Sequence, residues 1–108
     1  MIYLQITLKI SGVNRNRVVS LYQYYDALFL ETVTGAHSRE LLLRSEDLQV
    51  MYGFDTEKNA KAYLRSSLFT QDILGSIRPL LDTSPEIRLY QELYPLLSEN
   101  EALTDKAA

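Results

Sequence analysis

The first ten residues alternate between apolar and polar side chains. One set is Ile2, Leu4, Ile6, Leu8 and Ile10, and the other is Tyr3, Gln5, Thr7 and Lys9. A two-residue repeat rich in β-branched side chains is typical of a strand. The aliphatic face predicts packing against helices. The other face is too mixed for a core and too uncharged for an ordinary wet surface, so it could line a pocket or a subunit contact.

The periodicity then changes to that of a helix. Apolar residues recur at steps of three and four as Val18, Tyr22, Tyr25 and Phe29, which places them on one helical face. Asn14 can cap this helix, and Gly35 can end it in a left-handed conformation. We therefore expect a helix over about 14–34.

Two short alternating runs follow, at residues 38–44 and 48–54, with a polar Ser-Glu-Asp loop between them. This arrangement predicts a β-hairpin. In the second run Val50, Tyr52 and Phe54 share a face. If that face points toward helices, its aromatic rings would be core anchors.

Asp55 or Thr56 can cap a second helical region that continues to Leu81. A break near residues 66–71 predicts two short helices, and Pro79 should loosen the last turns because it lacks a backbone donor. Residues 86–91 alternate again and predict a fourth strand. We expect 92–97 to be a short extension that packs or exchanges with a partner, and 98–108, SENEALTDKAA, to be a loosely ordered polar tail.

This order of elements, β-α-β-β-α-β, predicts an α+β, ferredoxin-like fold in which a four-stranded antiparallel sheet carries its helices on one face. Residues 1–97 should form a single domain, since the chain has 108 residues. The opposite sheet face would expose Tyr3, Gln5, Thr7, Leu42, Met51 and Tyr90. Leaving apolar area wet costs about 25 cal/mol per Å², so we expect a homodimer through this open face that completes an α/β barrel.

Composition narrows the chemistry. The chain has no cysteine and one histidine, which argues against disulfides, thiolate catalysis and a multi-histidine metal site, so no metal or cofactor is expected. A net charge of -3 argues against nucleic-acid binding. No apolar run reaches the roughly 20 residues of a membrane span, so we expect no membrane contact and a cytoplasmic location.

Several segments together resemble a known family. They are Gly35 at the entry to the hairpin, RS-x-x-L-x-V-M-Y-x-F at 44–54, A-Y-L-x-S-x-L-F at 62–69, IRPLL at 77–81 and EIRLY at 86–90. The sequence resembles the dimeric α/β barrel superfamily and, within it, the antibiotic biosynthesis monooxygenase-like domains, which include quinol monooxygenases and haem-degrading relatives. These segments span most of the chain.

The resemblance implies a cofactor-independent monooxygenase-like protein that binds a small aromatic or quinol-like molecule, deprotonates it and lets the anion react with oxygen. Relatives commonly carry a Trp on the third strand and a His in the second-helix motif. This chain has no Trp, and Tyr63 stands at the His position, so haem ligation there is not expected. The alternatives are a non-catalytic dimeric ligand-binding or stress-associated module that has lost the active site, and a domain that works only within a larger complex.

Six residues are candidates for the site. Tyr63 and His37 are the catalytic candidates; Tyr3, Arg44, Tyr52 and Arg88 are the substrate-binding candidates. Phenol groups can donate to a substrate oxygen or stack on its ring, and a neutral imidazole can act as a base. Tyrosines at these positions could equally be core aromatics with one polar end, and a loop histidine could simply face solvent.

The two arginines are predicted on strands, where they alternate with leucines. Guanidinium groups near a pocket could hold an anionic or phenolate substrate by paired hydrogen bonds. The alternative is an ion pair with Glu40 or Glu86 at a sheet edge.

Overall fold

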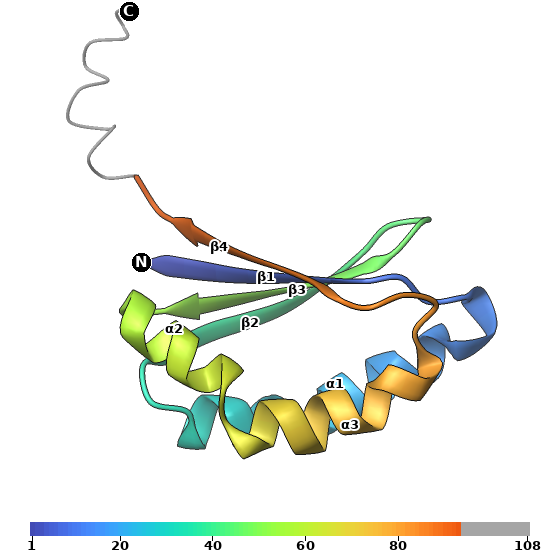
Figure 1. Ribbon diagram of the computed structural model, residues 1–108, viewed down its shortest axis with the longest axis horizontal. Coiled ribbons are helices and arrows are strands. Elements are labelled where there is room, and N and C mark those ends of the chain that lie inside the picture. Colours follow the sequence, from blue (N-terminus) through green and yellow to red (C-terminus); the bar gives the residue numbers. More distant parts are fainter. Residues whose placement is uncertain (94–108) are drawn as a thin grey trace, which may run out of the picture.

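The computed structural model describes residues 1–93, and it confirms the β-α-β-β-α-β order (Figure 1). The expected end of the extension at 97 and the polar tail lie outside the described residues. The elements are β1 (Ile2–Leu8), α1 (Gly12–Thr32), β2 (Ala36–Leu43), β3 (Leu48–Phe54), α2 (Glu57–Leu64), the π-helix η1 (Leu68–Ile73), α3 (Leu74–Ile77), the 3-10 helix η2 (Arg78–Leu80) and β4 (Glu86–Gln91).

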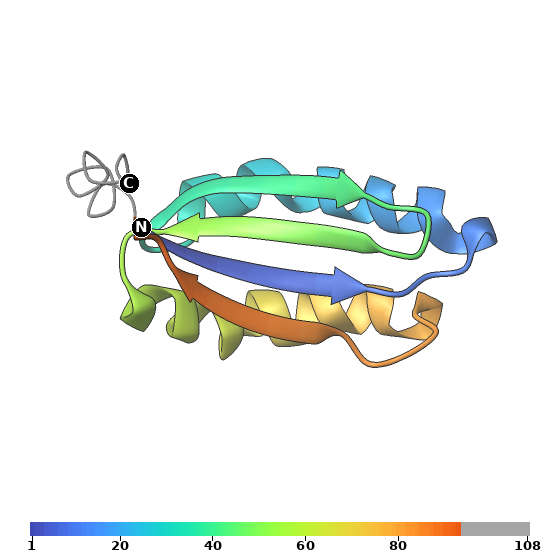
Figure 2. The ribbon, with the colours of Figure 1, turned by 90° about the horizontal axis from the view of Figure 1, so that it is seen from above.

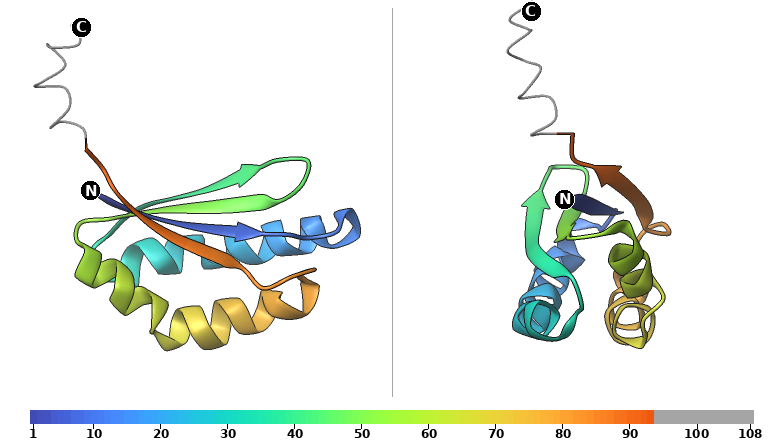
Figure 3. Two further views of the ribbon diagram at one scale, coloured as in Figure 1. Left: turned by 45° about the horizontal axis from the view of Figure 1, so that its top comes forward. Right: turned by 90° about the vertical axis from the view of Figure 1, so that its left-hand side faces the viewer.

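The four strands form one antiparallel sheet in the order β2-β3-β1-β4. The helices all lie beneath one face of it, with α1 and the α2–α3 segment running side by side (Figures 2 and 3). Gln5 stands opposite Met51 on one side and Arg88 on the other. Leu4, Ile6 and Leu8 of β1 are buried toward the helices and Ile2 is half-buried, as the two-residue repeat predicts.

Helix α1 starts earlier than the sequence predicts. Ser11 occupies the N-cap instead of Asn14, and the backbone N–H of Asn14 donates to the Ser11 carbonyl at 3.0 Å. The helix ends at Thr32, where the N–H of Val33 donates to the Phe29 carbonyl at 3.1 Å. The prediction of a helix over 14–34 was therefore displaced by two residues at each end.

The break in the second helical region falls at Arg65 and Ser66, at the start of the predicted interval. The Ser66 hydroxyl donates to the Tyr63 carbonyl at 2.6 Å and accepts from the Phe69 N–H at 3.2 Å. The Ser66 side chain thus satisfies a backbone carbonyl and a backbone N–H near the end of α2, and the chain continues as a π-helix. Thr56 caps α2 as predicted, accepting from the Asn59 N–H at 3.1 Å.

Gly35 makes the turn between α1 and β2 with φ 79. A Cβ atom there would collide with the Asp55 carboxylate and the Asn59 side chain, which hydrogen-bond to each other at 2.8 Å. Only glycine fits both the backbone conformation and the space.

Gly35→Ala should lower the free energy of unfolding by about 1–3 kcal/mol, because it adds the left-handed penalty to a steric clash. Chemical denaturation measures the change. The matched control is Gly75→Ala in α3, where nothing lies within 4 Å of the added Cβ and helix propensity favours alanine by roughly 0.5–1 kcal/mol. Equal effects of the two substitutions would contradict the role given to Gly35.

Candidate functional site

Aromatic rings fill the space between the sheet and the helices, and two of them belong to the candidate site residues Tyr52 and Tyr63. Phe29 of α1 lies 4.9 Å from the Tyr52 ring and 5.1 Å from the Tyr63 ring, measured between centroids. Tyr52 and Tyr63 lie 5.3 Å apart, and Phe54 and Phe69 close the group. These five side chains, the aromatic cluster, are buried. Tyr52 and Tyr63 therefore pack against each other, and they line no common pocket among the described residues: Tyr63 borders a separate hollow of about 300 Å³ between the end of α1 and α2, which Tyr52 does not line.

The hydroxyls of these two tyrosines meet inside the protein, with Tyr63 donating to Tyr52 at 3.4 Å. Burial raises the pKa of Tyr63 far above its ordinary value, and the neighbouring Tyr52 raises it further. Burial also raises the pKa of Tyr52, although the hydrogen bond from Tyr63 and the charge of Arg39 oppose the increase. Both phenols are neutral donors at physiological pH, so neither is suited to act as a base there.

A buried arginine lies beside this cluster. Arg39 projects from β2 toward the helices, in register with Tyr52 on β3, and its side chain is only 4% exposed. Its Nη1 donates to the backbone carbonyl of Tyr22 at 2.6 Å and to Asp26 Oδ1 at 3.2 Å. The guanidinium carbon also lies 4.5 Å from the centroid of the Tyr22 ring, a distance at which the cation is attracted to the ring face.

Two polar atoms of this group, the Tyr22 hydroxyl and Arg39 Nη2, are buried and make no hydrogen bond of normal length among the described residues, although both residues lie near the Tyr52 hydroxyl. Burial raises the pKa of Tyr22 well above its usual value, so the hydroxyl keeps its proton. Buried polar groups are nearly always satisfied, and those that are not call for an explanation such as a missing ligand or water.

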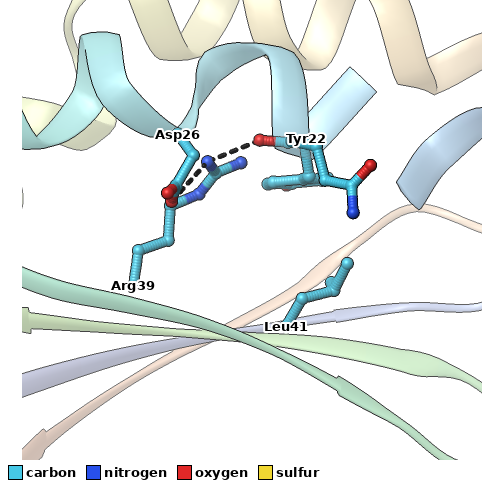
Figure 4. Close-up of a pocket in the computed structure, with 5 residues that line it drawn as sticks. Tyr22, Asp26, Arg39 and Leu41 are labelled. Atoms are coloured by element: carbon cyan, nitrogen blue, oxygen red, sulfur yellow. Dashed lines mark hydrogen bonds and ion pairs between the residues drawn. The ribbon is translucent and has the colours of Figure 1, made fainter. Parts of the chain in front are cut away.

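A cavity of about 270 Å³ opens at this point, between α1 and the edge strand β2. Its lining residues are Tyr22, Gln23, Asp26, Arg39 and Leu41. Figure 4 shows the guanidinium of Arg39 reaching up to α1 between Asp26 and Tyr22, with Leu41 next to it on the strand. We call this the α1–β2 cavity. It places a cation, a phenol and an aliphatic wall around one small space.

The other candidate residues lie elsewhere. Tyr3 and Arg88 sit on the open face of the sheet, and Arg88 Nη2 is 3.6 Å from Glu86, which matches the ion-pair alternative. His37 is not in a loop as expected. It is exposed and lies in β2 at a register shift between Ala36 and Ser38. The structure therefore brings Tyr52 and Tyr63 together and leaves Tyr3, Arg88 and His37 apart from them.

The prediction of Arg44 on a strand was wrong. β2 ends at Leu43, and Arg44 turns back to form a paired ion bridge with Asp47, with Nε to Oδ1 at 2.9 Å and Nη2 to Oδ2 at 2.7 Å. Arg15 of α1 donates to the carbonyls of Arg44 and Ser45, both at 2.7 Å. These contacts shape the hairpin tip, and the Arg44 guanidinium depresses the pKa of Asp47 by hydrogen bonding.

Sequence reasoning therefore missed Arg39 and treated Tyr22 only as part of the helix stripe. One signal was available: Arg39 shares its strand face with Leu41 and Leu43, so an alternating strand puts a charge on the side that packs against helices. A charged residue in such a position is normally paired or functional.

The described part of the chain contains no cluster of three His, Asp or Glu residues placed to hold a metal ion. None of its helices combines the length and the apolar character that crossing a bilayer requires.

Comparison with solved structures identifies the fold. A candidate antibiotic biosynthesis monooxygenase from Nitrosomonas europaea aligns over 87% of this chain and 100% of its own, with a TM-score of 0.75 and 10% identity. The chain has the antibiotic biosynthesis monooxygenase-like fold. A second candidate monooxygenase, from Caulobacter crescentus CB15, gives a TM-score of 0.74 at 14% identity over 84% of this chain and 88% of its own.

A conserved protein from Methanosarcina mazei Go1 is equally similar, with a TM-score of 0.74 and 17% identity over 84% of this chain and 91% of the other. No family model and no curated protein matches the sequence. At identities of 10–17% the similarity is one of fold.

Proposed function

We propose that this protein is a homodimeric small-molecule-binding protein whose ligand is a small aromatic, quinol-like compound held by one of its oxygens in the α1–β2 cavity. The observation that carries the proposal is that Arg39 and Tyr22, which both line that cavity, each have a buried polar atom without a normal hydrogen bond among the described residues, Nη2 of Arg39 and the hydroxyl of Tyr22. Both can donate a hydrogen, so together they favour an acceptor oxygen. The sequence also predicted that an arginine and tyrosines bind the ligand, but at different positions.

The size and walls of the cavity agree with such a ligand. A cavity of about 150 Å³ is enough for benzene, so a space of about 270 Å³ accommodates one ring or two fused rings. The Tyr22 ring and Leu41 supply apolar contact surface. Binding at the cavity would also satisfy two groups whose burial is otherwise costly.

Arg39→Met should weaken the binding of 1-naphthol about tenfold or more, since a buried hydrogen bond to a charged group contributes roughly 1.5–3 kcal/mol. Isothermal titration calorimetry measures the affinity, and circular dichroism checks the fold. Methionine is a suitable replacement because an apolar side chain of similar size often substitutes for a buried charge without loss of stability.

Arg88→Met is the matched control. It removes the same group from the open face and should leave 1-naphthol binding unchanged. Loss of binding in Arg88→Met, with wild-type binding in Arg39→Met, would return the site to the open face and refute the α1–β2 assignment.

A second candidate function is cofactor-free oxidation of the bound ligand, and Arg39 favours it specifically. A guanidinium beside a phenol oxygen stabilises the phenolate, the form expected to react with oxygen. The similar folds named as candidate monooxygenases support the same idea. The packing of the candidate residues Tyr52 and Tyr63 inside the aromatic cluster favours binding without catalysis.

Oxygen uptake with a panel of quinols and naphthols separates the two functions. If oxidation occurs at the α1–β2 cavity, Arg39→Met should abolish uptake, while Tyr63→Phe and His37→Ala should leave it near the wild-type rate because neither residue lines that cavity. Binding without any uptake makes the protein a non-catalytic module. Uptake that depends on Tyr63 or His37 would contradict the proposed location of the chemistry.

The proposed dimer uses the open face of the sheet. Tyr90 and Leu42 are exposed there, and a shallow hollow is lined by Tyr3, Gln5, Glu40, Met51 and Tyr90. Gln5 donates to Gln49 at 2.8 Å and accepts from the Tyr90 hydroxyl at 3.3 Å. Because these polar groups already bond to one another, a partner sheet could cover them without leaving them unsatisfied.

Met51→Lys should convert the dimer to a monomer, because it puts a charge in the middle of the buried face. Size-exclusion chromatography with light scattering gives the mass. Ser20→Lys on the exposed surface of α1 adds the same charge away from the sheet and should remain dimeric. A wild-type protein that is monomeric at micromolar concentration would refute the interface.

A further inference from the structure

The carboxylate of Asp26 is held loosely at the α1–β2 cavity. It touches Arg39 through one oxygen only, at 3.2 Å, and its side chain is 52% exposed whereas that of Arg39 is 4% exposed. In Figure 4 the Asp26 side chain extends from α1 and lies next to the Arg39 guanidinium. A single, half-exposed contact of this kind contributes little, because water can replace it.

Arg39 keeps its position without Asp26. The backbone carbonyl of Tyr22 accepts from Nη1 at 2.6 Å, and the guanidinium lies over the Tyr22 ring. Both contacts come from an α1 residue that is itself buried. The cation is therefore fixed by neutral groups, while its negative partner can turn toward solvent.

The guanidinium then offers two donors to an incoming anion. Nη2 has no partner among the described residues, and Nη1 regains a free hydrogen when Asp26 leaves. A carboxylate can take both in the paired geometry that arginine favours, and a phenolate oxygen can take one. A neutral ligand would not replace the lost charge, so we expect it to bind with Asp26 still in place.

We propose that Asp26 is the exchangeable counterion of Arg39 and that the ligand binds as an aromatic anion, which takes the place of the Asp26 carboxylate. This inference rests on the proposed function. Asp26 thereby sets the charge selectivity of the site. While it is in place the cation is neutralised, and only a ligand that carries its own negative charge compensates fully for its departure.

The test uses two probes of the same shape, 1-naphthoate and its neutral amide, 1-naphthamide, titrated calorimetrically into the full-length wild type, Asp26→Asn and Arg39→Met. In Asp26→Asn the anion no longer competes with a carboxylate. It should bind about three- to fivefold tighter, the range expected from the strength of exposed ion pairs, while the affinity for the amide stays the same. Asp72→Asn, an exposed acid on η1, controls for the change in net charge and should match the wild type.

Unchanged or weaker 1-naphthoate binding in Asp26→Asn refutes the exchange. Equal tightening of 1-naphthoate and 1-naphthamide also refutes the exchange, because charge would then not be the cause. In either case the proposed function survives if 1-naphthoate binds the wild type and loses affinity in Arg39→Met. If neither these probes nor 1-naphthol binds any variant, both the exchange and the proposed function are refuted.

Discussion

The packing of five aromatic rings between sheet and helices is the interaction on which the rest of the structure depends. Phe29 comes from α1, Tyr52 and Phe54 from β3, Tyr63 from α2 and Phe69 from η1. Aromatic pairs at these separations contribute about 0.5–1.5 kcal/mol each beyond the area they bury. The cluster joins both helical segments to the centre of the sheet and fills the space there, and the α1–β2 cavity lies beside it at the edge of the sheet.

Next to this cluster lies Arg39, the buried residue with the greatest potential to bind a ligand. A guanidinium buried beside the cluster would be strongly unfavourable if nothing compensated its charge. It is compensated by a carbonyl, a ring face and a half-exposed carboxylate, and one of its nitrogens is left over. An apolar residue of similar size is often as stabilising as a buried charge, so the arginine supports the ligand-binding function proposed above.

The sequence predicted the fold well because local patterns determine it. The two-residue repeat of β1, the cap at Thr56 and the hairpin formed by β2 and β3 all follow from side chains close together in the chain. The site was predicted less well because it depends on contacts between distant segments. Alternation correctly placed Tyr52 toward the helices, but nothing local shows that Phe29 and Tyr63 fill the space in front of it. The importance of Arg39 likewise depends on the Tyr22 carbonyl, 17 residues away in the sequence.

Strand geometry explains how binding and dimerisation can use the same sheet without competing. Successive residues of a strand point to opposite faces, so on β2 Arg39 enters the α1–β2 cavity while the next residue, Glu40, lines the hollow of the open face. The cavity lies between α1 and an edge strand, on the helix side of the sheet. A partner that covers the open face would therefore leave the helix side free, and each subunit of a dimer would retain its own complete site.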